Sequence, residues 1–382
     1  MHLEEEMMKK LISTLLLSGI LFVSSSLFAI NKNQSIEYVR TLNRNASTDI
    51  DATFYNPAGL VFMKHEGLSI QVANQIIIQE KSVKEDSTLI NTYVGNEQEY
   101  KGEVNAYLFP DLHIAYKKEK MVFFFNFMPI AGGGSGEFKN GLPLFDNLLL
   151  GAPIKAAGTL SQLDPTSPVT YQVAPGSYSR ELAFTGTQYT LASTIGGAYK
   201  VNKKFSVAAG YRLQYARAEY SGYAKDLSWQ ALATGTISDI QNAALVAQGL
   251  NTTGTSFAGL PFETIMTGLT QKVELDTVAT GWGHSIVAGA HIRPIDKLDI
   301  GFRVDWNSPL KIKYDTSTMK GHPLYTSQLE KDYGDGVTTY VTEPWLFALG
   351  VSYNITKELR VEVNTTAELY EYVNYTDEYE ED

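Results

Sequence analysis

Residues 298–307 read LDIGFRVDWN, and this stretch decides the fold that we expect. Side chains of a β-strand point alternately to its two faces, so an alternation of apolar and polar residues predicts a strand with one face of each kind. Here the apolar face carries Leu298, Ile300, Phe302, Val304 and Trp306, and the other face carries Asp299, Gly301, Arg303, Asp305 and Asn307. The same alternation runs through 205–215 and 359–364. The pattern predicts a protein built mainly of β-strands.

A soluble β-sandwich would also alternate, but the strand lengths and the aromatic residues favour a membrane barrel. Several alternating stretches reach about ten residues, whereas strands of soluble proteins average about 5–6. Aromatic residues stand near the ends of the apolar faces, as Phe205 and Tyr215 do. Transmembrane barrels need strands of about 9–11 residues and carry aromatic girdles at both interfaces. We therefore expect an all-β fold, a transmembrane antiparallel β-barrel in a bacterial outer membrane. A β-sheet can cross the hydrocarbon of a membrane only if it closes on itself, so that no edge is left unpaired.

The expected barrel occupies residues 66–382, and alternation predicts nine strands within it. Their approximate ranges are 66–80, 105–118, 120–137, 181–201, 204–220, 272–294, 297–314, 338–355 and 358–373. Short turns join some of these strands, and the long segments 138–180, 221–271 and 315–337 are expected to be external loops. Bacterial single-chain barrels have an even number of strands, and the acidic stretch 375–382 does not alternate. We therefore expect a C-terminally truncated chain.

The first 29 residues have the pattern of an export signal. The positive pair Lys9 and Lys10 precedes an apolar run, 11–23, which is followed by small residues. We expect a signal peptide that is cleaved after Ala29 or after Ser26. An uncleaved anchor helix would show a similar run, although this one is short for a membrane span.

The composition of the 382-residue chain argues against several other functions. The chain has no cysteine, which excludes thiolate metal sites and disulfides. Its net charge of −11 argues against a nucleic-acid partner, since phosphate binding needs a basic surface. The histidines, including His113, His284 and His291, show neither a metal-ligand spacing nor a catalytic arrangement with serine. We expect no enzyme activity, no metal and no cofactor.

Several motifs, in order along the chain, resemble the FadL-type outer-membrane transporters of long-chain fatty acids and aromatic hydrocarbons. DIDATFYNPAGL at 49–60 resembles the family segment with a central Asn-Pro-Ala. LFPDLH at 108–113 and the aromatic, glycine-interrupted stretch 125–138 resemble the second and third strands, and YARAE at 215–219 resembles the end of the fifth. The resemblance covers about 35–373. It implies a barrel of fourteen strands, of which roughly five would lie beyond this chain, and a lumen plugged by an N-terminal hatch.

The resemblance assigns residues 30–65 to this hatch and suggests that Asn56, Pro57 and Ala58 form its gate. Proline fixes φ, removes a hydrogen-bond donor and favours an extended residue before it. The amide of Asn56 could then bond to the barrel wall or to water. The alternative is an ordinary turn that leads into the first strand.

Gly132, Gly133 and Gly134 interrupt the aromatic third strand. Glycine within a strand marks bulges and bends, and a bend here resembles the kink through which the family releases an apolar ligand sideways into the bilayer. The alternative is a flexible strand end or a glycine-rich external loop.

The long insert at 227–271 contains apolar residues at helical spacing. Two small helices would form a groove that resembles the family's surface capture site, and its lining would include Ile237, Ile240, Leu245, Phe262, Ile265 and Met266. The alternative is that these helices only cap the barrel.

Arg212 and Arg303 lie on polar, lumenal strand faces and could bind a ligand carboxylate. Because Asp299 and Asp305 share the face of Arg303, an internal salt bridge is the favoured alternative.

Together these features predict a channel for passive uptake of a hydrophobic small molecule, with a long-chain fatty acid as the first candidate. The expected partners are this ligand, outer-membrane lipid and lipopolysaccharide, and the expected state is a monomer. An aromatic hydrocarbon is the close rival ligand. A surface barrel without transport, such as an adhesin, is the alternative from another functional class.

Overall fold

The computed structural model describes residues 35–95, 98–163, 170–229, 231–234, 269–356 and 358–369. This part of the chain is dominated by one 13-stranded sheet whose paired strands are all antiparallel. The expected signal peptide lies outside the described residues. Within them, no helix combines the length and the apolar character that a membrane crossing requires.

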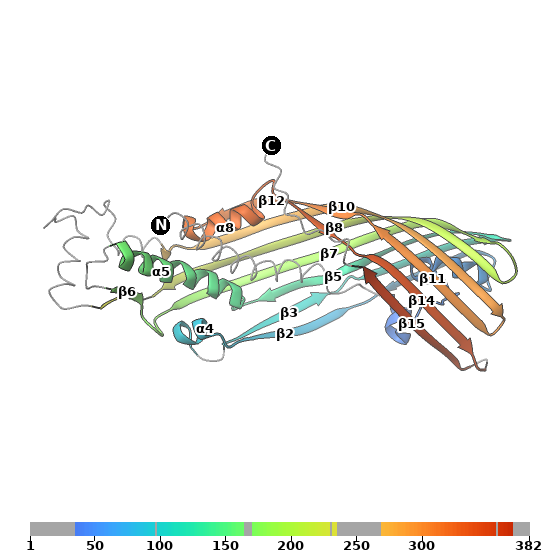
Figure 1. Ribbon diagram of the computed structural model, residues 1–382, viewed down its shortest axis with the longest axis horizontal. Helices are drawn as coiled ribbons and strands as arrows, with labels where there is room; N and C mark the ends of the chain where they lie inside the picture. Colours follow the sequence, from blue (N-terminus) through green and yellow to red (C-terminus); the bar gives the residue numbers. More distant parts are fainter. Residues whose placement is uncertain are drawn as a thin grey trace.

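The strands of the large sheet are long and run side by side along the molecule (Figure 1). They are β1 (Gly67–Asn74), β2 (Ile77–Glu85), β3 (Gln98–Ala106), β4 (Pro110–Lys118), β5 (Met121–Phe138), β7 (Ser179–Lys200), β8 (Phe205–Ser228), β10 (Val273–Ile295), β11 (Leu298–Asn307), β12 (Pro309–Lys320), β13 (Thr338–Thr342), β14 (Trp345–Asn354) and β15 (Arg360–Leu369). A separate two-stranded sheet joins β6 (Thr170–Val173) to β9 (Ala231–Thr234).

The strand order confirms the nine passes that alternation predicts. The main path is β1-β4-β5-β7-β8-β10-β11-β14-β15, so consecutive passes are neighbours. Four passes consist of two pieces each, namely β1 with β2, β3 with β4, β11 with β12, and β13 with β14. The fold is that of an antiparallel barrel wall.

The strands extend further than expected at one end of the wall. The second expected strand begins at Gln98 rather than at 105, and β8 continues to Ser228 rather than ending at 220. The first residues of the expected loop 221–271 therefore belong to β8. In the same way, the first residues of the expected loop 315–337 belong to β12. Alternation did not show these extensions because polar and charged residues are frequent in them, as in β2, where most side chains are exposed.

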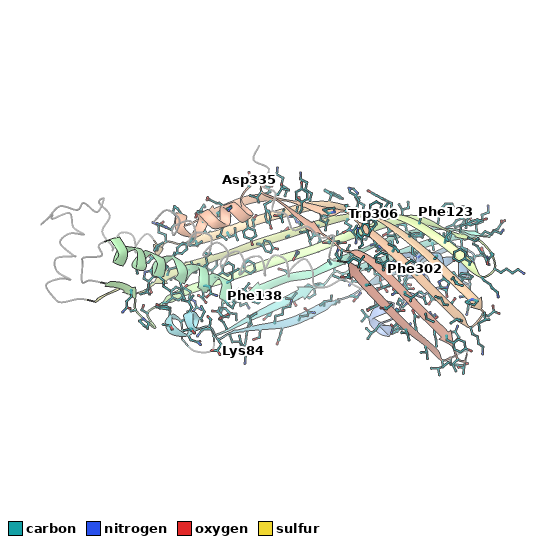
Figure 2. The ribbon with its side chains drawn as sticks, viewed as in Figure 1. Lys84, Phe123, Phe138, Phe302, Trp306 and Asp335 are labelled. Carbon is teal, nitrogen blue, oxygen red and sulfur yellow. The ribbon has the colours of Figure 1, made fainter. Side chains whose placement is uncertain are left out.

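The exposed outer side chains of the wall include many large apolar residues, whereas many of its buried side chains are polar. Phe123, Phe302 and Trp306 are exposed and project from the outside of the sheet (Figure 2). The buried polar residues of the wall include Asp111, His113, Asn126, Thr194, Arg212, Gln214, Ser285, His291, Asp299, Arg303, Asp305 and Ser352. A soluble protein buries its apolar face instead, so this arrangement suits a barrel whose outside faces lipid.

Residues 35–63, called the inner segment below, form α2 (Ile36–Thr41), α3 (Ala52–Tyr55) and the 3-10 helix η1 (Pro57–Phe62). Ser35 caps α2 by accepting a hydrogen bond from the N–H of Tyr38. Pro57 opens η1, where its missing N–H is harmless, and the preceding Asn56 is extended with φ −160°. The sequence Asn-Pro thus ends one short helix and starts the next.

Helices from three connections gather at the opposite end of the molecule from the inner segment (Figure 1). They are α4 (Thr88–Tyr93), α5 (Pro143–Leu163) and α8 (Pro323–Tyr333). Their apolar residues form one buried cluster with the strand ends, which contains Ile90, Leu149, Leu150, Leu182, Leu227, Leu269 and Tyr325. The expected loops 138–180 and 315–337 therefore contain helices that are packed together.

Candidate functional site

The inner segment contacts strands from β4 to β15, so the sheet curls around it. Ser206 of β8 donates a hydrogen bond to the carbonyl of Ala58 (2.7 Å), and Asn126 of β5 donates to that of Thr53 (2.7 Å). Arg360 of β15 donates to the carbonyl of Ala46 (3.0 Å). A segment held from strands so far apart in the sheet lies within the lumen.

Asn56 of the Asn-Pro-Ala motif is completely buried between the inner segment and the wall. Its Nδ2 donates to the carbonyl of Ala290 on β10 (3.1 Å). There is room for its amide because Gly289 and Gly301 have no side chain. A Cβ at Gly289 would stand only 2.6 Å from Asn56 Oδ1. Asn56, Pro57 and Ala58 therefore lie against the wall, as expected, and their role as a gate stays a prediction.

Arg212 and Arg303 lie together on the lumenal face and share Asp305. Arg212 Nη1 is 2.7 Å from Asp305 Oδ2, and Arg303 Nε is 3.0 Å from Oδ1. The salt bridge to Asp305 is thus present, whereas Asp299 pairs with His291 and Arg293. The role of the two arginines in carboxylate binding stays a prediction.

The same arginines also hold the inner segment, which parity alone did not predict. Arg303 Nη1 donates to the carbonyls of Phe54 (2.5 Å) and Tyr55 (3.0 Å). The Phe54 ring lies 5.1 Å from the Arg212 guanidinium and 5.6 Å from that of Arg303, within cation–π range. Arg212 Nη2 is buried and has no hydrogen-bond partner. Movement of Phe54 would therefore uncover two cations in the lumen.

A second polar contact joins α3 to β4. His113 is completely buried, with its Nδ1 2.5 Å from Thr53 Oγ1 and its Nε2 paired with Asp111. A hydroxyl, an imidazole and a carboxylate in a row have the composition of a hydrolytic triad. All three residues are buried, however, so they serve here as a contact between the inner segment and the wall.

The loop 44–47 is an anchor that sequence reasoning missed. Arg44 Nη2 donates to Ser47 Oγ (2.8 Å) and Asp49 Oδ2 (3.0 Å), and its guanidinium also pairs with Asp51. Burial lowers the pKa of Arg44, but the hydrogen bonds and charges of Asp51 and Asp49 outweigh this effect and raise the pKa above its ordinary value. The arginine therefore stays charged and keeps the loop compact.

The expected kink in β5 is an interruption in strand pairing. Gly132 and Gly134 have φ of +82° and +91°, and the register between β5 and β7 shifts on both sides of Gly132. On its other side, β5 pairs with β4 up to Phe127 and with β3 from Ser135. The intervening residues, 128–134, have no register partner there. The pairing between the second and third passes is therefore interrupted at this stretch, which includes Gly133.

Apolar residues connect the inner segment to this interruption. Tyr38 stacks on Tyr55 with ring centroids 5.7 Å apart, and both belong to a cluster with wall residues. The buried members of this cluster are Phe54, Tyr55, Met128, Ile130 and Ala192. Tyr107 and Leu108, at the break between β3 and β4, are exposed. The interruption in pairing thus has buried apolar residues at β5 and exposed ones between β3 and β4.

A further apolar patch lines the lumen between the inner segment and the helices. It consists of Ala216, Ala218, Tyr220, Ala279, Leu310, Ile312 and Tyr314, with Phe184 and Tyr333 beside them. The expected groove residues Ile237, Ile240, Leu245, Phe262, Ile265 and Met266 lie outside the described residues.

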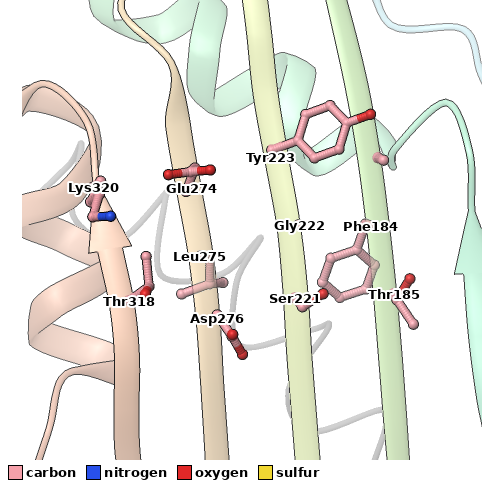
Figure 3. Close-up of a pocket in the computed structure, with 11 residues that line it drawn as sticks. Phe184, Thr185, Ser221, Gly222, Tyr223, Glu274, Leu275, Asp276, Thr318 and Lys320 are labelled. Carbon is pink, nitrogen blue, oxygen red and sulfur yellow. The ribbon is translucent and has the colours of Figure 1, made fainter.

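A pocket between β7, β8, β10 and β12 borders the apolar patch, because Phe184 lines the pocket and also packs against the patch (Figure 3). Its lining includes Thr185, Ser221, Glu274, Asp276 and Lys320, so it is mainly polar and carries mixed charge. Sites for apolar ligands are lined mostly by hydrophobic side chains. This pocket therefore does not belong to the candidate site.

Comparisons with known proteins bear on the fold. No protein-family model matches the sequence, and no curated protein matches it. Among solved structures, a FadL homologue of Pseudomonas aeruginosa is 13% identical, with 89% of this chain and 69% of that chain covered and a TM-score of 0.51. The toluene transporter TodX of Pseudomonas putida is 14% identical, with 82% and 64% covered and a TM-score of 0.38.

Only the first of these two similarities is close enough to support an argument, and at its low identity it concerns the fold alone. This chain spans less than two thirds of the toluene transporter's length. The match to the FadL homologue covers 89% of this chain, whose long antiparallel strands form one curled wall. The described chain therefore has the fold of the FadL-type barrels, which confirms the resemblance of its sequence motifs.

Proposed function

We propose that this protein is a bacterial outer-membrane channel for passive uptake of hydrophobic compounds, with long-chain fatty acids as the first candidate. One observation carries the proposal: the stretch 128–134 of β5, which has no register partner on β3 or β4, lies next to the aromatic residues of the inner segment. In this proposal the inner segment is a hatch, and its movement opens a sideways route to the bilayer.

A sideways exit suits an apolar ligand better than a water-filled pore does. Each methylene gains about 0.8 kcal/mol on leaving water, so an acyl chain of about sixteen methylenes gains roughly 13 kcal/mol by entering lipid. The exposed Tyr107 and Leu108 lie in the break between β3 and β4, opposite the stretch of β5 that has no partner on these two strands. A ligand released there would pass from the apolar cluster around Phe54 and Tyr55 into the bilayer without crossing water.

The proposed path begins among the helices and ends at the kink. The insert 227–271 would capture the ligand, and the lumenal patch that includes Tyr220, Ile312 and Tyr314 would guide its chain. The hatch blocks the next part of the path through Phe54 and Tyr55. Passage therefore requires the hatch to move. In this proposal ligand binding and diffusion of the ligand are enough to drive passage, without another energy source.

Arg212 and Arg303 are the candidate partners of a ligand carboxylate. A carboxylate is a stronger acceptor for a guanidinium than a main-chain carbonyl, because the hydrogen bond is then charge-assisted on both sides. The unpartnered Nη2 of Arg212 supports this role. Asp305 already neutralises part of their charge, so the site would bind a carboxylate weakly enough to release it.

The outward apolar residues are proposed to contact outer-membrane lipid and lipopolysaccharide. Tyr215 packs on Trp282 with ring centroids 4.8 Å apart, and Trp306 on Trp345 at 5.7 Å. Such outward aromatic pairs suit the interfacial girdle of a barrel that acts as a monomer.

Uptake of labelled oleate by cells that express the full-length protein tests the sideways exit. We expect Gly134→Val to lower uptake at least fivefold, because valine is strained at φ +91° and its Cβ would stand 2.4 Å from the Asn105 carbonyl oxygen. Gly197→Val is the control, since a Cβ there meets nothing closer than 3.7 Å. Equal uptake by both variants and the parent would contradict the proposed exit.

The same cells distinguish the two ligand classes. We expect Arg212→Met to lower the ratio of oleate uptake to toluene uptake, since toluene has no carboxylate, whereas any loosening of the inner segment would act on both ligands. Transport of toluene but not of oleate by the unmodified protein would favour the aromatic-hydrocarbon alternative. Transport of neither would favour a surface barrel without transport.

A further inference from the structure

Two glycines form a flat place in the lumenal wall, directly beneath the inner segment. Gly301 of β11 pairs with Gly350 of β14. On either side, Gly301 pairs with His291 of β10 and Gly350 with Asn364 of β15. These four residues form one row across four neighbouring strands, and Gly301 and Gly350 are called the glycine rung below.

The main chain of the inner segment lies against the glycine rung without room for a side chain between them. A Cβ at Gly301 would stand 2.1 Å from the carbonyl oxygen of Asn45 and 2.5 Å from Asn56 Nδ2. A Cβ at Gly350 would stand 2.6 Å from the nitrogen of Ala46. Carbon atoms in proteins do not approach polar main-chain atoms so closely, so any larger residue would lift the segment off the wall.

Polar contacts hold the segment in place at the end of the row. The Asn364 amide, with its oxygen towards the inner segment, accepts hydrogen bonds from the N–H groups of Arg44 (2.7 Å) and Asn45 (3.1 Å). Glu362 Oε1 accepts from the N–H of Ala46 (3.1 Å). These bonds form only if the main chain reaches the wall, which the two glycines allow.

Within the wall, a Cβ at Gly350 would meet only the end of the Asn364 side chain, at 2.6 Å, and the closest contacts of a Cβ at Gly301 are all with the inner segment. Neither Gly301 nor Gly350 has a positive φ, so other residues could adopt the same backbone. Glycine also weakens a strand interior relative to residues with side chains. The contact with the inner segment is therefore what accounts for glycine here.

We infer that Gly301 and Gly350 are positioning residues that set how closely the inner segment is seated and thereby keep the channel closed. The inference rests on the proposed function only in that the inner segment blocks the lumen; it does not depend on which ligand passes. Replacing either glycine by alanine would lift loop 44–47 and weaken its hydrogen bonds to β15. The segment would then leave its seat more often.

A thiol reporter measures seating without any ligand. The chain has no cysteine, and Ser47 is completely buried when the segment is seated. We use Ser47→Cys as the parent and add Gly301→Ala or Gly350→Ala, with Gly197→Ala as the matched glycine control. We expect at least tenfold faster labelling by a water-soluble maleimide, and a larger ion conductance in planar bilayers, for the two rung variants only.

Folding is checked by the shift in electrophoretic mobility that a barrel shows before and after heating. Folded rung variants with parental labelling and conductance would overturn the inference. So would rung variants that fail to fold while Gly197→Ala folds, because the wall itself would then require the glycines. A change in labelling without any change in oleate or toluene uptake would support the seat while counting against the proposed function.

Discussion

At the scale of single residues, the wall of this barrel holds the inner segment mainly through main-chain atoms. Arg303, Asn126 and Ser206 all donate to carbonyl groups of residues 53–58. Such contacts do not depend on the side chains of the segment, and they satisfy polar groups that short helices leave unpaired. The strength of the contact therefore resides largely in the wall residues.

We expect Arg303→Met to loosen the inner segment by about 2–4 kcal/mol, because it leaves the buried carbonyls of Phe54 and Tyr55 without their donor. Hydrogen–deuterium exchange of peptides from 35–63 would then accelerate roughly 30- to 1,000-fold, since about 1.4 kcal/mol corresponds to a factor of ten. Lys225→Met, which removes an exposed ion pair with Glu181, should change exchange little. Unchanged exchange in Arg303→Met would show that these two bonds do not hold the segment.

At the scale of elements, α5 is fixed to the barrel by one buried ion pair. Asp146 in its first turn is completely buried and accepts two hydrogen bonds from Arg180 at the start of β7 (2.8 and 2.7 Å). Tyr100 of β3 donates to the same carboxylate. The Asp146 carboxylate thus joins α5 to β7 and β3.

We expect Arg180→Met to release α5, because it leaves the Asp146 carboxylate buried without a cation, at a cost of about 3–5 kcal/mol. Limited proteolysis within 143–163 should become at least a hundredfold faster, since cleavage follows local opening. Arg217→Met is the matched control, because its ion pair with Glu219 is exposed and is worth about 0–1 kcal/mol. Equal resistance of the two variants to protease would contradict a role for Asp146 as the anchor.

At the scale of the whole molecule, the inverted polarity of the wall predicts where the protein is stable. Phe302 is 43% exposed on the outside of β11, while its neighbour Arg303 is buried in the lumen. In water such an exposed apolar face would promote association, but in a bilayer it is the face that lipid covers. The two media therefore give opposite predictions for a charge at Phe302.

In phospholipid bilayers we expect Phe302→Lys to lower the free energy of unfolding by about 2–4 kcal/mol, as measured by reversible urea unfolding, because lipid does not solvate the charge. Val83→Lys should change it by less than about 0.5 kcal/mol, since Val83 lies in β2, where the neighbouring side chains are exposed and polar. A Phe302→Lys protein that is unaffected in bilayers, or that becomes freely soluble without detergent, would contradict the membrane assignment.

The sequence alone was sufficient for the nine strands of the wall and the two faces of each. Alternation is a local property, because neighbouring side chains of one strand must point to opposite sides. The lumenal positions of Arg212 and Arg303, and the salt bridge to Asp305, followed from parity and were found. The ends of β2 and β8 were missed, because polar and charged residues interrupt the alternation there.

What only the tertiary structure decided is how the inner segment meets the wall. The seat of Asn45 and Ala46 consists of Gly301, Gly350 and Asn364, which are more than 250 positions away in the chain. No local pattern distinguishes these glycines from others in the strands. The sheet curls, and this brings strand residues that are far away in the sequence next to the inner segment. Their close contact depends on the curvature of the sheet and on the register of its strands. The formation of each strand, in contrast, depends on the local order of its residues.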